Sequence, residues 1–190
     1  MEIPLITIEY PAWLAGTIDW DRRYLTDEDK MAVAILLSRL NVTHGTGEPF
    51  GAAIFRTADG RLVSVGMSQV VRQHNSILHA EVMAIMMAES RLQTFNLRVG
   101  GQRHELFSSC EPCAMCLGAT HWSSVVRLVC GATRDDAQQI GFDEGPGFPA
   151  SYRYLEERGV ALVHRVQREE ARAVIEAYAA GGGLIHNRQE

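Results

Sequence analysis

Two short segments of the chain carry side chains that can hold a metal ion and activate water. Residues 79–81 read His-Ala-Glu, and residues 112–116 read Pro-Cys-Ala-Met-Cys. Cys113 and Cys116 are three residues apart, so on a helix they share one face and can bind one ion together. Thiolate and imidazole ligands suit zinc, and the set His79, Cys113 and Cys116 leaves the fourth tetrahedral position open for water. This donor set is typical of a catalytic rather than a structural zinc site.

Glu81 is the candidate base beside this metal. Water bound to zinc ionises near neutral pH, but a nearby base must take its proton. A spacing of two residues is awkward within a regular helix, because each residue turns the helix by about 100°. His79 and Glu81 therefore face the same ion only if His79 lies at the mouth of the helix and Glu81 reaches back past it. Both helix N-termini would then point at the site, where their dipoles favour thiolate and hydroxide.

A closed structural zinc site is the alternative that the cysteine spacing leaves open. Cys110, Cys113 and Cys116 are evenly spaced, so these three thiols and His79 make up a possible four-ligand set. Cys110 comes before Pro112, at the end of a predicted strand rather than on the helix. We therefore expect the Cys110 side chain to point elsewhere.

The positions of the cysteines argue against both a disulfide framework and an iron–sulfur cluster. All four cysteines fall within residues 110–130, whereas a disulfide framework would spread them along the chain. A ferredoxin-like iron–sulfur cluster would need a cysteine four residues after Cys116, and that position is Thr120. Cys130 lies in an apolar stretch and is most simply a buried thiol.

The overall composition is that of one folded domain. The 190 residues are 46% hydrophobic and 22% charged, which is enough for a substantial core. The formal net charge of -5, with acidic and basic residues interleaved, argues against a nucleic acid partner. No apolar run is long enough to span a bilayer, and the N-terminus lacks the pattern of a secretory signal, so we expect a cytoplasmic protein.

The predicted secondary structure alternates between strands and helices. Strands are predicted at residues 50–57, 61–67, up to about 108, 125–132 and 160–165. Helices are predicted at residues 26–41, 78–92, from Pro112 onward, and at 135–139, 152–158 and 168–180. Thr26 begins a sequence that resembles a capping box, Asn75 or Ser76 is available to cap the second helix, and residues 59–60 form a hairpin turn. This order predicts an α/β domain with an antiparallel hairpin at one edge.

The combination of His-x-Glu with Pro-Cys-x-x-Cys resembles the signature of the cytidine deaminase superfamily. Residues 109–113 (Ser-Cys-Glu-Pro-Cys) and 141–146 (Gly-Phe-Asp-Glu-Gly-Pro) are most similar to bacterial guanine deaminases, and residues 49–52 (Pro-Phe-Gly-Ala) belong to the same pattern. The resemblance implies a three-layer α/β/α fold around a mixed five-stranded sheet. It also implies a homodimer, in which C-terminal segments often close the partner's active site.

The resemblance further implies hydrolytic deamination of a small heterocycle with one zinc ion per chain, best matched by guanine going to xanthine and ammonia. Glu81 would carry a proton from water to a ring nitrogen. Glu144, or Asp143 as the second choice, would help to deliver the proton that ammonia needs to leave, although both are also readable as solvated loop carboxylates. The residues expected to contact the substrate are Phe50, Ser68, Ala80 and Phe142.

The chain differs from the family's pattern at two places that are expected to recognise the substrate. Relatives commonly have an asparagine where this chain has Ser68, and Asp-Pro-Thr-Ala where residues 75–78 read Asn-Ser-Ile-Leu. A polar group of the substrate that is left without a hydrogen-bond partner in a buried site costs about 1–3 kcal/mol of binding free energy. This is enough to change which substrate the site prefers. An aminotriazine such as ammeline, a pterin, cytosine or a nucleoside therefore remains an alternative substrate.

Two other functions are alternatives to a deaminase of small heterocycles. A tRNA or DNA base deaminase is disfavoured by the acidic balance, and a non-catalytic zinc-stabilised binding protein would be free to lose Glu81.

Residues 1–25 are predicted to be an irregular arm packed on the domain or on a partner, ahead of a deaminase domain at residues 26–190. Residues 184–187 are either a lid over the active site or a frayed polar tail.

Overall fold

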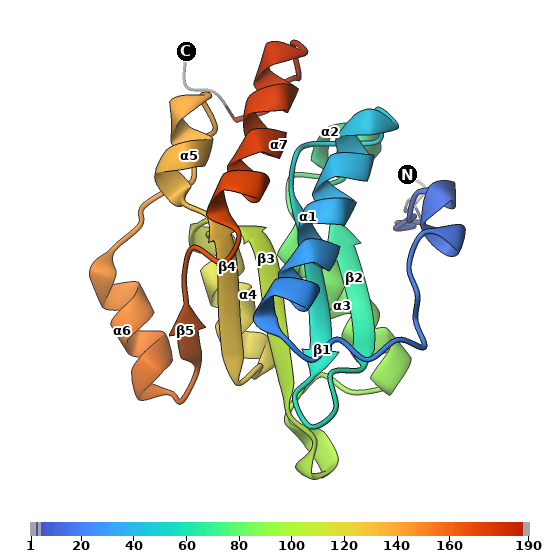
Figure 1. The fold of residues 1–190 in the computed structure, drawn as a ribbon, viewed down its shortest axis with the longest axis vertical. Coiled ribbons are helices and arrows are strands. Elements are labelled where there is room, and N and C mark those ends of the chain that lie inside the picture. The colour runs from blue at the N-terminus through green and yellow to red at the C-terminus, as the bar shows by residue number, and fades with distance from the viewer. Residues whose placement is uncertain (1–2, 4, 188–190) are drawn as a thin grey trace.

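The computed structural model describes residue 3 and residues 5–187, which form one mixed sheet with helices on both faces (Figure 1). The remaining positions of the predicted arm and tail, residues 1–2, 4 and 188–190, lie outside the described residues. The strands are β1 (Gly51–Arg56), β2 (Leu62–Met67), β3 (His104–Cys110), β4 (Arg127–Ala132) and β5 (Ala161–Val163). Their order is β2-β1-β3-β4-β5, with β1 antiparallel to both neighbours and β3, β4 and β5 parallel. The predicted five-stranded sheet with an antiparallel hairpin at one edge is confirmed.

The helices complete three layers. They are α1 (Asp27–Thr43), α2 (Val70–Gln73), α3 (Ala80–Leu92), α4 (Ala114–Ser123), α5 (Arg134–Gln139), α6 (Pro149–Glu157) and α7 (Arg168–Ala180), with short 3-10 turns η1 (Ala12–Gly16) and η2 (Val99–Gly101). Helices α1 and α7 cover one face of the sheet, and α3 and α4 cover the other (Figure 1). Alternate residues of β1 serve the two cores: Ala53 and Phe55 pack with α1, whereas Ala52 and Ile54 pack with α3.

The helix beginnings differ from the prediction at the two places that matter for the site. Helix α3 begins at Ala80 with His79 as its N-cap, not at residue 78. Asn75 does not cap this helix, because its side chain accepts from the Ile77 amide and so closes a turn ahead of α3. Pro112 precedes the Cys113 N-cap of α4 and lies outside the helix. The short helix α2 was not predicted at all.

The arm packs against its own domain. The Tyr10 hydroxyl donates to the Met83 carbonyl at 2.7 Å, and Trp13 Nε1 donates to Thr46 Oγ1 at 3.1 Å. Leu14 and Ile18 are buried in the core beside α1. The arm therefore adds apolar burial to the α1 side of the molecule. Among the described residues, no helix has the length and apolar character needed to cross a membrane.

Candidate active site

The imidazole of His79 and the thiols of Cys113 and Cys116 lie together at the ends of two helices. Their ligand atoms are all within 4.8 Å of one another, and His79 Nδ1 is 3.5 Å from Cys113 Sγ. His79 and Cys113 are the N-caps of α3 and α4, and both have extended backbone. His79 thus lies at the helix mouth, the position that its two-residue spacing from Glu81 requires.

The chemistry of this group suits zinc. The hydrogen bond from Cys116, together with the His79 imidazole, outweighs burial and lowers the pKa of Cys113 to about 4. Thiolate is the form that binds a metal, and the N-termini of α3 and α4 contribute partial positive charge that favours it. One imidazole and two thiols leave a fourth tetrahedral position free for a water molecule or a substrate.

Glu81 lies directly beside the three ligands. It belongs to the first turn of α3 and is buried. The Ser108 hydroxyl of β3 donates to Glu81 Oε1 at 3.0 Å, which fixes the orientation of the carboxyl group. Burial raises the pKa of Glu81, and the charge of the Cys113 thiolate raises it further. A carboxylate with a raised pKa is a better proton acceptor, as general base catalysis needs.

Glu144, in the loop that follows α5, supplies a second carboxyl group. Its side chain is buried, and its backbone carbonyl accepts from the Ala114 amide at 3.1 Å. Burial, followed by the charges of Cys113 and Glu81, raises the pKa of Glu144 to about 8. The carboxylate of the neighbouring Asp143 accepts from the Gly145 amide within the loop at 2.8 Å. Glu144 lines the same cavity as His79 and Cys113, and the choice of Glu144 ahead of Asp143 as the proton donor stays a prediction.

His79, Glu81, Cys113 and Glu144 line one small cavity of about 20 Å³, which has room for about one water molecule. Phe50 and Phe142 form part of its wall, with ring centroids 4.9 Å apart in an edge-to-face contact. Ala80 also lines the cavity. The full lining is Phe50, His79, Ala80, Glu81, Cys110, Glu111, Cys113, Phe142, Glu144, His186 and Asn187.

Comparison with known proteins identifies the family. A model of the cytidine and deoxycytidylate deaminase zinc-binding region matches residues 25–132, which include His79, Glu81, Cys113 and Cys116. The chain belongs to this family. The superfamily predicted from the two motifs is thereby confirmed, and the deaminase is a zinc-dependent aminohydrolase.

Curated relatives and solved structures that are similar to the deaminase include guanine deaminases. The guanine deaminase of Bacillus subtilis (strain 168) is 35% identical over 127 residues, which is 67% of the deaminase and 78% of the relative. A solved structure of guanine deaminase from Nitrosomonas europaea is 36% identical, with a TM-score of 0.88 over 93% of the deaminase and 97% of that chain. A solved structure in complex with 2,6-diaminopurine is 37% identical, with a TM-score of 0.89 over 95% and 96% of the two chains.

Ser68 lies apart from the cavity lining. Its hydroxyl donates to Glu48 Oε2 at 2.6 Å, and both side chains are buried between β2, α2 and the turn after α1. Glu48 also accepts from the Val71 amide at 2.9 Å. The deaminase therefore uses Ser68 to satisfy a buried carboxylate, and a substrate contact through Ser68 stays a prediction.

The C-terminal tail closes the site of its own chain. The His186 ring centroid is 6.0 Å from that of His79 and 5.7 Å from that of Phe142. The Asn187 amide donates to the Asp143 carbonyl. Buried His186 Nδ1 and Asn187 Oδ1 have no hydrogen-bond partner among the described residues. His186 and Asn187 thus line the site of their own protomer, and closure of a partner's site by the tail stays a prediction.

Several lining residues were missed or misjudged from sequence. Glu111 and Cys110 line the cavity because β3 ends there. Cys110 Sγ is 3.4 Å from the Thr133 carbonyl and, as expected, is not part of the ligand group found among the described residues. Glu48 was not considered, since a single acid in a Gly-rich turn gives no signal. Cys130 is fully buried, as predicted.

Proposed function

We propose that the deaminase hydrolyses guanine to xanthine and ammonia with one zinc ion per chain, held by His79, Cys113 and Cys116. The observation that carries the proposal is that two residues of this ligand group, His79 and Cys113, line one cavity together with the buried carboxyl groups of Glu81 and Glu144. The choice of guanine is supported by relatives of 35–36% identity that are guanine deaminases.

The residues divide the proton transfers between them. A zinc ion at the ligand group would lower the pKa of a coordinated water. Glu81, oriented by Ser108, accepts a proton from the attacking water and passes it to a ring nitrogen of the substrate. Glu144, whose burial raises the pKa of its carboxyl group, donates a proton to the departing amino group. The water oxygen replaces nitrogen on the ring carbon, and nitrogen leaves as neutral ammonia. The remaining proton of the water passes to the Glu144 carboxylate as the carbonyl group forms, which restores both carboxyl groups to their starting states.

Binding of a flat heterocycle calls for rings on its faces and for a site closed to water. Phe50 and Phe142 are placed to stack on or pack against the heterocycle. A cavity of about 20 Å³ cannot hold a purine, so His186 and Asn187 must move aside for entry. Their return would exclude water and would offer Asn187 Oδ1, which has no hydrogen-bond partner among the described residues, to the substrate.

The serine at position 68 favours testing a second class of substrate. Its hydroxyl is bonded to Glu48, and a serine hydroxyl is too short to make the two-sided contact of the asparagine amide that relatives commonly have at this position. Another amino-substituted heterocycle, such as ammeline, a pterin or cytosine, is the alternative that this difference favours.

A substrate panel tests the proposal. Zinc-loaded protein is assayed for ammonia release with guanine, 2,6-diaminopurine, ammeline, pterin, cytosine and cytidine. We expect kcat/KM to be highest for guanine, by about 10-fold or more over each of the others. A higher value for any other heterocycle rejects guanine as the substrate and leaves the deaminase chemistry in place.

A homodimer and a cytoplasmic location are also part of the proposal. The dimer is supported by large apolar side chains beside α4 and α6, where Trp122 is 78% exposed and Phe148 is 59% exposed. Phe148 lines a groove of about 460 Å³ that also includes Leu117 and Tyr154. Exposed apolar surface of this kind is typical of protein interfaces. Light scattering of the wild type and of Trp122→Ser tests this, since the proposal requires a dimer that the substitution weakens.

A further inference from the structure

Arg134 connects the two segments on which the proposed chemistry depends. Its guanidinium donates to the Pro112 carbonyl at 3.2 Å, to the Glu144 carbonyl at 3.3 Å and to the Gly145 carbonyl at 2.8 Å. Pro112 immediately precedes the Cys113 ligand, and Glu144 carries the proposed acid. One side chain thus holds the ligand segment and the Glu144 segment in a single arrangement.

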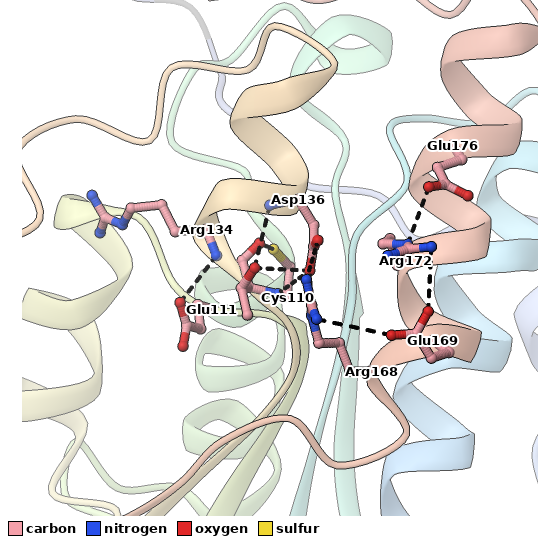
Figure 2. A network of polar contacts seen from close by, with 9 residues as sticks. Cys110, Glu111, Arg134, Asp136, Arg168, Glu169, Arg172 and Glu176 are labelled. Atoms are coloured by element: carbon pink, nitrogen blue, oxygen red, sulfur yellow. Dashed lines mark hydrogen bonds and ion pairs between the residues drawn. The ribbon is translucent and has the colours of Figure 1, made fainter.

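Arg134 is itself held firmly at the start of α5. Thr133 and Asp136 form a capping box, and the Arg134 amide donates to Glu111 Oε2 at 3.0 Å. Figure 2 shows the Arg134 guanidinium directed away from the ion pair between Asp136 and Arg168, although all three residues belong to one neighbourhood. The side chain therefore extends from an anchored backbone toward the site, away from the Asp136–Arg168 ion pair that joins α5 to α7.

The loop that carries Glu144 is anchored at Phe142, which packs on Phe50, and at the Asp143 carbonyl, which accepts from Asn187. Arg134 holds the residues that follow, Glu144 and Gly145. Residues 141–148 form no helix or strand, and the Ala114 amide supplies one other bond to the Glu144 carbonyl. At Gly147 the loop passes so close to Arg134 that an added Cβ would lie 2.3 Å from the guanidinium. A glycine at this position leaves the space that the guanidinium occupies.

We propose that Arg134 is a positioning residue that locks the Glu144 loop against the Cys113 segment, so that the Glu144 carboxyl group stays at a fixed distance from the reacting centre. The inference rests on the proposed function, because it takes Glu144 as the acid. Arg134 does not contact the cavity, and it acts through the backbone carbonyls of the loop. A displacement of about 1 Å at a reacting group can reduce the rate on the order of 100-fold.

Four variants test the role in catalysis. Arg134→Gln is expected to lower kcat on guanine by about 10- to 100-fold, with KM within about 3-fold and zinc content unchanged. Arg134→Lys keeps the charge and restores part of the loss. Gly147→Ala pushes the guanidinium away and reproduces the fall in kcat while Arg134 is still present. Arg168→Gln removes an ion pair of the same helix, so it lowers the melting temperature but leaves kcat unchanged.

Amide hydrogen exchange provides a readout that needs neither metal nor substrate. Residues 142–147 are expected to exchange faster in Arg134→Gln and in Gly147→Ala than in the wild type or in Arg168→Gln. Unchanged exchange in this loop, or a kcat of Arg134→Gln equal to that of Arg168→Gln, overturns the inference. A wild type that is inactive on guanine rejects the proposed function instead, and the exchange experiment then still decides whether Arg134 locks the loop.

Discussion

The hydroxyl of Ser68 donates a 2.6 Å hydrogen bond to the carboxyl group of Glu48, and neither side chain is open to solvent. Removing the hydroxyl leaves a buried carboxyl group with one partner fewer. We expect Ser68→Ala to lower the free energy of unfolding by about 1–3 kcal/mol, and to change KM for guanine by less than about 3-fold. Urea denaturation and steady-state kinetics measure the two effects.

Ser64→Ala is the matched control for this change. Ser64 lies in β2, which ends just before Ser68, and its hydroxyl donates to the Ala84 carbonyl, which is neutral. Because hydrogen bonds to charged groups are stronger, the loss of stability is expected to be larger at Ser68 than at Ser64. A large rise in KM with unchanged stability would show that Ser68 contacts the substrate after all.

Removal of the tail is expected to impair turnover without loss of the metal. His186 and Asn187 form one wall of the cavity, and none of the three proposed zinc ligands is in the tail. A chain ending at residue 183 should retain zinc, and its kcat/KM for guanine should fall by about 10-fold or more, because water then enters the site. A chain ending at residue 187 is the control and should keep full activity. Equal kcat/KM for the two chains would contradict the lid.

Cysteine substitutions distinguish the ligands from their neighbours. Cys116→Ser is expected to abolish stoichiometric zinc binding, because one of three ligands to the metal is lost. Cys110→Ser should keep one zinc ion per chain, because the Cys110 thiol is 3.4 Å from the Thr133 carbonyl and outside the ligand group. Zinc is measured by mass spectrometry on dialysed protein. Loss of zinc from Cys110→Ser would support the closed structural site instead.

The ion pair between Asp136 and Arg168 makes stability depend on acid pH. Burial raises the pKa of Asp136, but the hydrogen bonds from Arg168 and Thr133 outweigh it and lower the pKa to about 2. Since the folded pKa is below the unfolded value, the stabilisation is fully present above about pH 4 and is lost as the pH falls through 2. Asp136→Asn should lower the free energy of unfolding by about 1–3 kcal/mol at pH 7 and flatten its dependence below pH 4. Urea denaturation from pH 7 to pH 2 checks both, and an unchanged slope would be evidence against this role.

Much of the architecture could be predicted because local signals and tertiary structure agree. The helix predicted at residues 168–180 matches α7 (Arg168–Ala180), since its apolar residues follow a helical period and pack on the sheet. The His-Ala-Glu and Pro-Cys-x-x-Cys segments indicated the metal ligands because their residue types are specific to zinc chemistry. The spacing of His79 and Glu81 even required His79 to lie at a helix mouth, where the structure places it.

Contacts between distant segments could not be predicted. The pairing of Ser68 with Glu48 joins the end of β2 to the turn after α1, and no local pattern marks it. The bonds from Arg134 to Pro112 and Glu144 likewise follow from how α5 lies beside the loops. The start of α3 was misplaced because Asn75 is a good helix cap in general, but here its side chain closes a turn.

The central claim is that Glu81 is the base of a zinc-dependent guanine deaminase. The most direct test measures ammonia and xanthine formation from guanine by zinc-loaded wild type and by Glu81→Gln, with zinc content determined on the same samples. The account predicts equal amounts of ammonia and xanthine from the wild type, and a fall in kcat of about 100-fold or more in Glu81→Gln with zinc retained. Undiminished turnover by zinc-loaded Glu81→Gln, or no turnover of guanine by the zinc-loaded wild type, would contradict it.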